Sequence, residues 1–384
     1  MTDEPSFHTL TPLCGAAEAK AVQGTPAAVG AFNINFYSQA VGVLKGLQKA
    51  DAPAIIQASK GANAFQGGPD KISAMLKLAM KNLGHTLPVC LHLDHGDEER
   101  AKECVDGGYS SVMIDASKLN FDENAATSKR IVDYAGAKGA TVEGEIGKLE
   151  GVEEDVVHEK TTYADPDEVV RFFRESGVDA LAIAYGTSHG PNKGANIDAV
   201  KTAIVRDSYS AMDDAGLTAD HFLVGHGSST VPQDIVAEIN EYGGNIQKAH
   251  GVPMEKIKEG IAFGLRKMNI DTDLRLGITA TVRKYLRDNP GIGEKYPDTL
   301  GRIAKAFAGE IEMTAKGKRV EPETVIDPRG YFGVIDIEVL REPATDESGL
   351  AELMALVEER IAAHVEMLVH EFGSAGLASQ VERG

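Results

Sequence analysis

Short apolar runs recur along the chain, and longer segments with apolar residues at helical spacing lie between them. Segments 69–83 and 165–177 show this spacing, with a Pro or an Asp near the start. The alternation is typical of βα units built around a parallel sheet. The predicted strands are residues 27–34, 52–59, 88–95, 110–117, 140–146, 179–186, 221–227 and 265–272.

Eight such strands are the number that closes a TIM (β/α)8 barrel. A doubly wound open sheet would give a similar alternation. Each of the eight runs, however, ends in polar residues able to do chemistry. A barrel gathers all eight carboxyl ends around one mouth, whereas an open sheet spreads them along an edge. We therefore predict an α/β fold with a catalytic barrel over residues 1–290.

The pattern changes after residue 290, where the chain becomes rich in turn residues. We expect residues 291–345 to form an insertion or arm that interrupts the last helical layer. Helical spacing returns in residues 346–384, and Gly373 is the expected stop. This terminal helix is expected to pack on the barrel or on a partner subunit.

Composition and charge narrow the function classes. The formal net charge of −19 and the lack of a basic stripe argue against nucleic acid as a partner. The three cysteines form no CxxC pair and no even disulfide framework, which fits a reducing compartment. The sequence has no leader pattern and no run of about 18 apolar residues, so we expect no membrane partner and a cytoplasmic location.

Histidines stand at three of the predicted strand ends: His95, His189 and His226. A single histidine at a strand end is more often structural than a ligand. Three imidazoles at one barrel mouth, in contrast, can bind a catalytic Zn²⁺ and leave a coordination position open for substrate. Carboxylates stand at the ends of the third, fourth, fifth and eighth predicted strands, and a divalent ion would offset their mutual repulsion. They are Asp94, Asp115, Glu143, Glu145 and Asp271.

A glycine- and serine-rich stretch, 225–239, follows the seventh predicted strand. Pro232 is expected at the first helical position, with Ser229 or Thr230 as the cap. Backbone N–H groups at such a helix start can bind phosphate, although the same residues would also be found at an ordinary helix N-cap that binds no ligand. Lys193, Thr272 and Arg275 add further donors for an anionic ligand.

These stretches together resemble a known family. The motifs are "HLDHG", "VMIDAS", "VEGEIG", "GTSHGPNKG", "GHGSSTVP" and "KMNIDTDLR", in this order, with "EFGSAG" near the end. They are similar to those of the zinc-dependent class II fructose-bisphosphate aldolases over about residues 10–290. The resemblance implies reversible cleavage of fructose 1,6-bisphosphate to dihydroxyacetone phosphate and glyceraldehyde 3-phosphate, through a zinc-stabilised enediolate.

The resemblance also implies roles for individual residues. His95, His189 and His226 would bind the Zn²⁺, and Asp115 and Glu145 would serve a second or alternate metal location. Asp94 would be the acid/base on the C4 hydroxyl, and Asn269 would contact the enediolate. Glu153 would be the loop acid that protonates the enediolate, with its neighbour Glu154 as the rival.

The resemblance further implies a substrate pocket for phosphorylated sugars. Ser59 and Arg275 match positions at the distal phosphate, with Arg275 reaching in from a neighbouring subunit, and Asn33 matches a position near the substrate. A monovalent cation, Na⁺ or K⁺, would lie near the phosphate, and a homodimer or homotetramer is expected. Two motifs depart from the commoner family patterns: "HGSS" stands for "HGGS", and "GPNKG" lacks an aromatic residue. The dihydroxyacetone-phosphate pocket would consist of Gly190, Lys193, Gly227, Ser229, Asp271 and Thr272.

Several alternatives stay open at this point. The substrate could be tagatose 1,6- or sedoheptulose 1,7-bisphosphate, because epimer choice depends on pocket contacts. The native ion could be Co, Fe or Mn instead of Zn. A Schiff-base aldolase would use a strand lysine such as Lys60 or Lys267. The remaining classes are a metal-dependent hydrolase and a non-catalytic sugar-phosphate-binding barrel.

Overall fold

The structure analysed is a computed structural model, which describes residues 4–147, 151–153, 156–158, 162–188, 199–315 and 317–381. Side chains are described in all of these ranges except 151–153 and 156–158.

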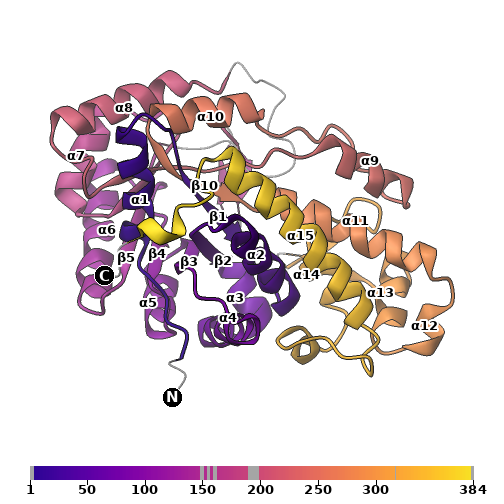
Figure 1. The fold of residues 1–384 in the computed structure, drawn as a ribbon. Coiled ribbons are helices and arrows are strands. Elements are labelled where there is room, and N and C mark those ends of the chain that lie inside the picture. The colour runs from indigo at the N-terminus through magenta and orange to yellow at the C-terminus, as the bar shows by residue number, and fades with distance from the viewer. Residues whose placement is uncertain are drawn as a thin grey trace.

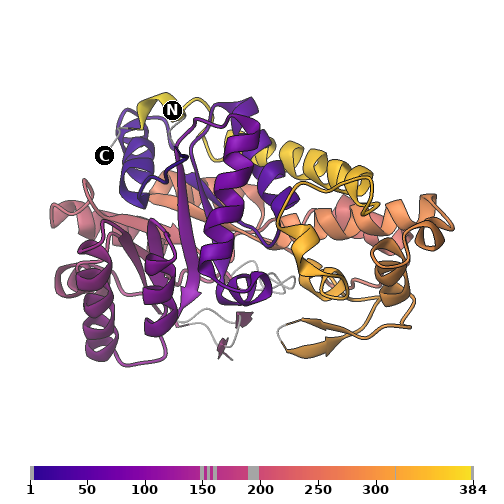
Figure 2. The ribbon, with the colours of Figure 1, turned by 90° about the horizontal axis from the view of Figure 1, so that it is seen from below.

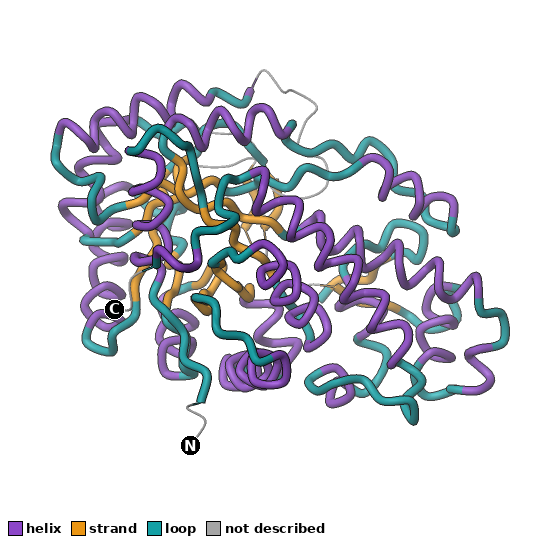
Figure 3. Tube along the Cα trace, viewed as in Figure 1, coloured by secondary structure: helices purple, strands orange, loops and turns teal. Residues whose placement is uncertain are grey.

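Eight parallel strands close into a barrel in the order β1-β10-β9-β8-β5-β4-β3-β2 (Figures 1 and 3). All eight predicted strands are confirmed, and no strand end differs from its prediction by more than three residues. The strands are β1 Val29–Asn33, β2 Ala54–Ser59, β3 Val89–Gly96, β4 Ser111–Ile114, β5 Thr141–Ile146, β8 Ala180–Ile183, β9 Phe222–Gly225 and β10 Leu265–Ile270. The predicted TIM barrel is therefore the observed fold.

Helices cover the outside of the barrel and follow its strands in sequence. Local capping marks their ends: the Asp165 side chain accepts hydrogen bonds from the first turn of α7, and Gly177 ends that helix in the left-handed conformation. The helices of this layer are α2 Tyr37–Ala50, α3 Lys60–Gln66, α4 Pro69–Leu83, α5 Glu98–Asp106, α6 Phe121–Gly136, α7 Pro166–Ser176, α8 Thr202–Asp214, α9 Gln233–Glu241, α10 Met254–Phe263 and α11 Thr272–Asp288.

Alternation along each strand separates two cores. On β3, Leu91 and Leu93 face outward and join the core between the barrel and its helices. Cys90 faces inward and joins a second core that fills the amino-terminal end of the barrel. Helix α1 (Leu10–Val22) closes this end with Leu10, Leu13 and Cys14. The inward positions nearer the carboxyl ends are polar, so the barrel is apolar at one end and charged at the other.

The chain after the barrel forms a separate group of short elements beside it (Figure 2). The antiparallel pair β11–β12 projects from this group. Another short antiparallel pair, β6 Gly151–Glu153 and β7 Val156–His158, follows β5. The elements of residues 291–345 are α12 Ile292–Lys295, α13 Leu300–Phe307, β11 Met313–Ala315, β12 Lys318–Val320, α14 Pro328–Phe332 and the 3₁₀ helix η2 Ile337–Leu340.

The long helix α15 (Ala351–Glu371) returns to the barrel and packs along α2 and α11, and the short 3₁₀ helix η3 (Ala378–Gln380) follows it. The apolar face of α15, which includes Leu353, Val357 and Ile361, is fully buried. Among the described residues, no helix combines the length and the apolar character that a membrane crossing requires.

Glycines on α2 let α15 approach closely. A Cβ atom at Gly46 would lie 2.7 Å from the Ala362 carbonyl oxygen and 2.9 Å from the Val365 Cβ. A Cβ at Gly42 would lie 2.8 Å from the Ile361 Cβ. The neighbouring atoms are backbone or branched carbons near the backbone, so they cannot move aside cheaply.

We expect Gly46→Ala to lower the free energy of unfolding by about 1–3 kcal/mol, because it overpacks the α2–α15 contact. The matched control is Gly136→Ala at the end of α6, where an added Cβ meets no atom within 4 Å. Removing a glycine there should be neutral or should stabilise by up to about 1 kcal/mol. Urea unfolding of the two variants measures the difference, and equal stabilities would contradict the close contact.

Candidate metal centre

An irregularity at the end of β3 turns two consecutive side chains toward the barrel mouth. Regular alternation would point His95 outward, as it does Leu93. Instead His95 has φ of 49°, in the left-handed region, and the pairing of β3 with β4 shifts register between Leu93 and Gly96. This conformation costs about 1–3 kcal/mol for a non-glycine residue. As a result, Asp94 and His95 both face the mouth.

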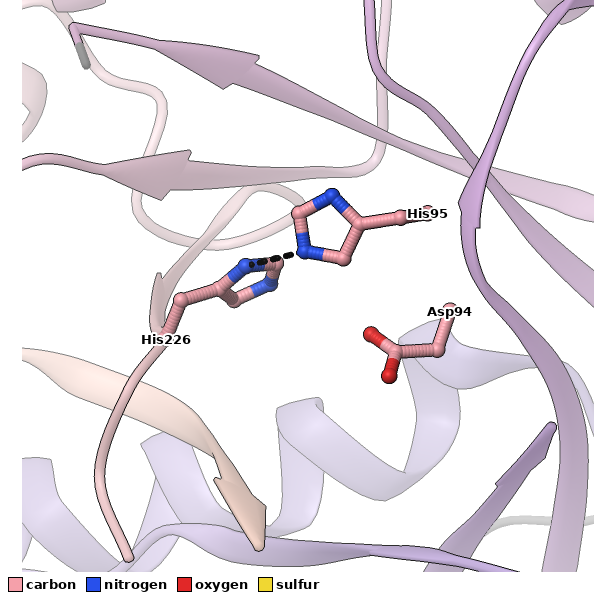
Figure 4. A group of neighbouring side chains, drawn as sticks. All are labelled: Asp94, His95 and His226. Carbon is pink, nitrogen blue, oxygen red and sulfur yellow. Dashed lines mark hydrogen bonds between the residues drawn. The ribbon is translucent and has the colours of Figure 1, made fainter. Parts of the chain in front are cut away.

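His226, which follows β9, meets His95 across the mouth (Figure 4). The Nε2 atom of His95 lies 3.0 Å from the Nδ1 atom of His226. One carboxylate oxygen of Asp94 lies within 4.8 Å of a nitrogen of each ring. Imidazole and carboxylate are ligands that Zn²⁺ prefers, and tetrahedral Zn²⁺ separates its ligand atoms by about 3.4 Å. The donor set and its spacing therefore fit a divalent cation.

Carboxylates hold the far nitrogens of both rings. His226 Nε2 lies 2.9 Å from Glu143 Oε1, and His95 Nδ1 lies 3.3 Å from Asp115 Oδ2 and 3.7 Å from Glu145 Oε2. Metal-binding histidines commonly have such a carboxylate on their second nitrogen, because it fixes the tautomer and the ring orientation. This arrangement directs His226 Nδ1 and His95 Nε2 toward one point.

Asp115 and Glu145, the expected second or alternate metal location, form another group with His95. Burial favours the neutral form of Asp115, but hydrogen bonds from His95 and Ser117 hold the pKa of Asp115 well below its usual value. The Ser117 backbone N–H and hydroxyl donate over 3.1 and 2.7 Å. Asp115 is therefore an ionised acceptor next to His95.

Asparagines fix the carboxylate of Asp94, which is 5% exposed. The Asn33 side-chain amide donates to Oδ2 over 2.7 Å, and the Asn269 amide donates to Oδ1 over 3.2 Å. Gln57 in turn donates to Asn33 Oδ1 over 2.8 Å. Both oxygens of Asp94 are thus oriented, and Asn33 and Asn269 lie at the same end of the barrel as the histidines.

The loop after β9 differs from the expected phosphate cradle. Helix α9 begins at Gln233, with Pro232 as its N-cap. The backbone N–H groups of Thr230 and Val231 donate to Asp273 over 2.9 and 2.7 Å, so a carboxylate of the protein already binds them. Ser229 is buried and accepts a hydrogen bond from the Asp271 backbone N–H over 3.3 Å. Donors for a phosphate would have to come from earlier in this loop.

Other predicted pocket residues lie around the same loop. Gly227 has φ of 63°, and a Cβ there would lie 2.6 Å from the Ser188 carbonyl oxygen, so the position requires glycine. Thr272 is buried at the start of α11.

Arg275 lies between two carboxylates. Its guanidinium forms ion pairs with Asp271 and Asp327 of its own chain, both at 2.7 Å. Arg329, which the sequence prediction missed, is the arginine beside Ser59: its Nη1 lies 3.5 Å from the Ser59 hydroxyl. It also lines a cavity of about 730 Å³ with Lys60 and Thr314. The stretch "DPRG" in the predicted arm was the available signal, but nothing local linked it to Ser59.

The remaining predicted site residues lie in other parts of the chain. His189, Gly190, Lys193 and Glu154 lie outside the described residues, and Glu153 belongs to β6, whose side chains lie outside them as well.

Comparisons with known proteins agree with one another. A family model for class-II fructose-bisphosphate aldolase matches residues 17–377. A fructose-bisphosphate aldolase of Giardia intestinalis is 42% identical over 265 residues, which cover 68% of this chain and 79% of the relative. A fructose-bisphosphate aldolase of Staphylococcus aureus is 36% identical over 294 residues, which cover 76% of this chain and 90% of the relative.

Solved structures share the fold. The crystal structure of a fructose-bisphosphate aldolase from Campylobacter jejuni matches with a TM-score of 0.63 and covers 96% of both chains. The structure of the YdjI aldolase from Escherichia coli K12 matches with a TM-score of 0.61 and covers 97% of this chain and 99% of that one. Both are 20% identical to this chain, so they bear on the fold alone.

We expect His226→Ala to abolish stoichiometric metal binding, because it removes an imidazole from the point where the ligands converge. The loss of affinity should exceed the roughly 10- to 100-fold that removal of an outer hydrogen-bond partner costs. Atomic absorption after reconstitution with Zn²⁺ measures the amount of metal bound. His370→Ala, on the exposed face of α15, is the control and should bind metal as the wild type does. Full metal content in the His226 variant would exclude this site.

Proposed function

Because the chain belongs to the class II fructose-bisphosphate aldolase family and is therefore an aldolase, we propose that it reversibly cleaves fructose 1,6-bisphosphate. The products are dihydroxyacetone phosphate and glyceraldehyde 3-phosphate. The observation that carries the proposal is the convergence of His95, His226 and Asp94 at one point, with a carboxylate behind each imidazole.

His95 and His226 would hold the catalytic ion, which we propose to be Zn²⁺, together with His189. Asp115 and Glu145 would serve its second or alternate location. A bound divalent cation supplies Lewis acidity, which polarises the C2 carbonyl of the ketose and stabilises negative charge that develops during cleavage. The chain's own residues supply the proton transfers and the binding of the two phosphates.

Asp94 is the proposed acid/base. In the cleavage direction its carboxylate takes the proton of the C4 hydroxyl, and the C3–C4 bond breaks. The C4 carbon becomes the aldehyde of glyceraldehyde 3-phosphate, and the electron pair of the bond passes to the other fragment as an enediolate. Asn269 would donate to this enediolate, and Glu153 or Glu154 would return a proton to C3. The hydrogen bonds from Asn33 and Asn269 support the role of Asp94, because they fix the direction of its oxygens.

Separate groups would bind the two phosphates. We propose Gly190, Lys193, Gly227, Ser229, Asp271 and Thr272 for the dihydroxyacetone phosphate half, with a monovalent cation nearby. Ser59 and Arg329 would bind the distal phosphate, since a guanidinium binds phosphate by charge-assisted hydrogen bonds. Arg275 would act there indirectly, through the Asp327 carboxylate that it shares with Arg329.

The proposal also covers the organisation of the protein. Residues 1–290 would carry the catalytic barrel, the arm 291–345 would supply Arg329, and residues 346–384 would brace the barrel. Tagatose 1,6- and sedoheptulose 1,7-bisphosphate stay alternative substrates. A cytoplasmic homodimer or homotetramer remains a prediction.

A Schiff-base mechanism is the second candidate, and the lysine environments weigh against it. A Schiff base requires an unprotonated amine that can reach the substrate. The ammonium of Lys267 is completely buried and ion-paired with Glu143 at 2.8 Å, and Lys60 is ion-paired with Asp97 at 3.2 Å.

We expect the purified protein to cleave fructose 1,6-bisphosphate in a coupled assay, to lose activity with a chelator and to regain it with Zn²⁺. Asp94→Asn should still bind metal, because the proposed ligands are the three histidines, but should lose about 10²- to 10⁴-fold in kcat, the usual contribution of a positioned acid/base. Parallel assays with tagatose 1,6- and sedoheptulose 1,7-bisphosphate identify the preferred substrate. Activity that survives the chelator, together with borohydride trapping of substrate on a lysine, would favour the second candidate.

For Arg329→Gln we expect kcat/KM on fructose 1,6-bisphosphate to fall about 10- to 100-fold, since a hydrogen bond to a charged group contributes about 1.5–3 kcal/mol. Fructose 1-phosphate, which lacks the distal phosphate, should be cleaved at an unchanged rate. Arg341→Gln is the control on the same arm, because that guanidinium donates to Gln66 instead. Equal losses on both substrates would show that Arg329 acts only on the fold.

A further inference from the structure

A fully buried lysine lies beneath the proposed acid/base and the proposed metal ligands. Lys267 and Asn269 are alternate residues of β10 and both face into the barrel. The Lys267 ammonium lies 2.8 Å from Asn269 Oδ1 and 2.8 Å from Glu143 Oε2, and its side chain is 0% exposed. It therefore touches the partners of Asp94 and of His226 but neither residue directly.

The chemistry of an ammonium fixes which atom of Asn269 it meets. Lysine only donates hydrogen bonds, so it must bind the amide oxygen, and the amide NH₂ must point to the other side. On that side the NH₂ donates to Asp94 Oδ1 over 3.2 Å. Lys267 thus decides that Asn269 presents N–H groups, and not its oxygen, to the space above the barrel core.

The contact with Lys267 is the shorter of the two contacts that orient this amide. The amide oxygen lies 2.8 Å from the ammonium, whereas the amide nitrogen lies 3.2 Å from Asp94. The Lys267 ammonium is ion-paired with Glu143 and takes no part in the proposed proton transfers. The orientation of Asn269 at the moment when the enediolate forms therefore depends on Lys267.

We propose that Lys267 is a positioning residue for the reaction: it locks the Asn269 amide so that its N–H groups face the negative charge of the enediolate. The inference rests on the proposed function. Preorganised donors of this kind accelerate a reaction because they are already aimed at the charge when it develops. A purely structural role, in which Lys267 only neutralises Glu143, is the alternative.

The test must remove the contact with Asn269 without leaving a buried unpaired charge. Lys267→Met alone would leave the Glu143 carboxylate uncompensated and destabilise the fold strongly. Combining it with Glu143→Gln makes the pair neutral, and the Gln oxygen can still accept from His226 Nε2. Glu143→Gln alone would leave the Lys267 ammonium unpaired in the same way, so the wild-type protein is the control.

We expect the double variant to bind Zn²⁺ stoichiometrically, with a kcat about 10- to 100-fold below that of the control and a KM within about twofold of it. Calorimetry gives a second readout, independent of turnover. The affinity for a phosphorylated hydroxamate that mimics the enediolate should fall by a similar factor, while that for dihydroxyacetone phosphate changes little. A Lys267→Gln/Glu143→Gln variant keeps a neutral hydrogen-bond donor at position 267. It should recover part of the loss in kcat and in hydroxamate affinity, and it serves as the test if the Lys267→Met/Glu143→Gln variant does not fold.

The outcomes separate the inference from the function on which it rests. A double variant equal to its control in kcat and in hydroxamate affinity overturns the positioning role and leaves the aldolase proposal standing. A parallel loss of affinity for both ligands also overturns it, because the enediolate charge would then not be the target. A wild-type protein that cleaves none of the ketose bisphosphates overturns both.

Discussion

The ion pair between Lys267 and Glu143 in the barrel interior is the interaction on which the arrangement of polar side chains at the barrel mouth depends. Removing two charges from water costs several kcal/mol per ion, so each ion needs its partner and further hydrogen bonds. Here the further bonds lead toward the mouth: the acid accepts from His226, and the lysine donates to Asn269. Loss of one partner would leave a buried charge, a change that costs about 3–5 kcal/mol. The orientations of His226 and Asn269 at the mouth therefore depend on the same buried ion pair.

Strand periodicity predicted the barrel and a large part of the site because both follow from local alternation. Each strand buries one side chain in two on the inner face, so the inward position of Asp94 and Glu143 could be derived from their spacing to apolar neighbours. Convergence then follows from closure, since strands far apart in the sequence end at one mouth. Neither alternation nor closure depends on the loops, and neither predicts positions where the backbone departs from regular geometry.

Three features escaped prediction for that reason. The sequence predicts His95 at the barrel mouth, but the φ of 49° and the register shift that turn it inward are not specified by the residues Asp94, His95 and Gly96. Arg329 reaches Ser59 across 270 positions of sequence, and no periodicity links the arm to β2. The loop after β9 looked like a helix start with open N–H groups, but Asp273 from α11 binds two of them and holds Val231 at φ of 51°. All three depend on backbone geometry or tertiary contacts that local patterns do not encode.

The tautomer of His95 connects the two candidate metal groups. Its Nε2 faces His226, and its Nδ1 faces Asp115 and Glu145. A neutral imidazole carries one proton and one lone pair, so it can direct the lone pair to only one of the groups at a time. Hydrogen bonds from His95 and Ser117 hold the pKa of Asp115 below its usual value, and a carboxylate acceptor beside Nδ1 favours the proton on Nδ1 and the lone pair on Nε2. The carboxylates on Nδ1 would thus direct an ion toward the side of Asp94, where the proposed chemistry requires it, and the two groups would be alternative locations linked by a single proton.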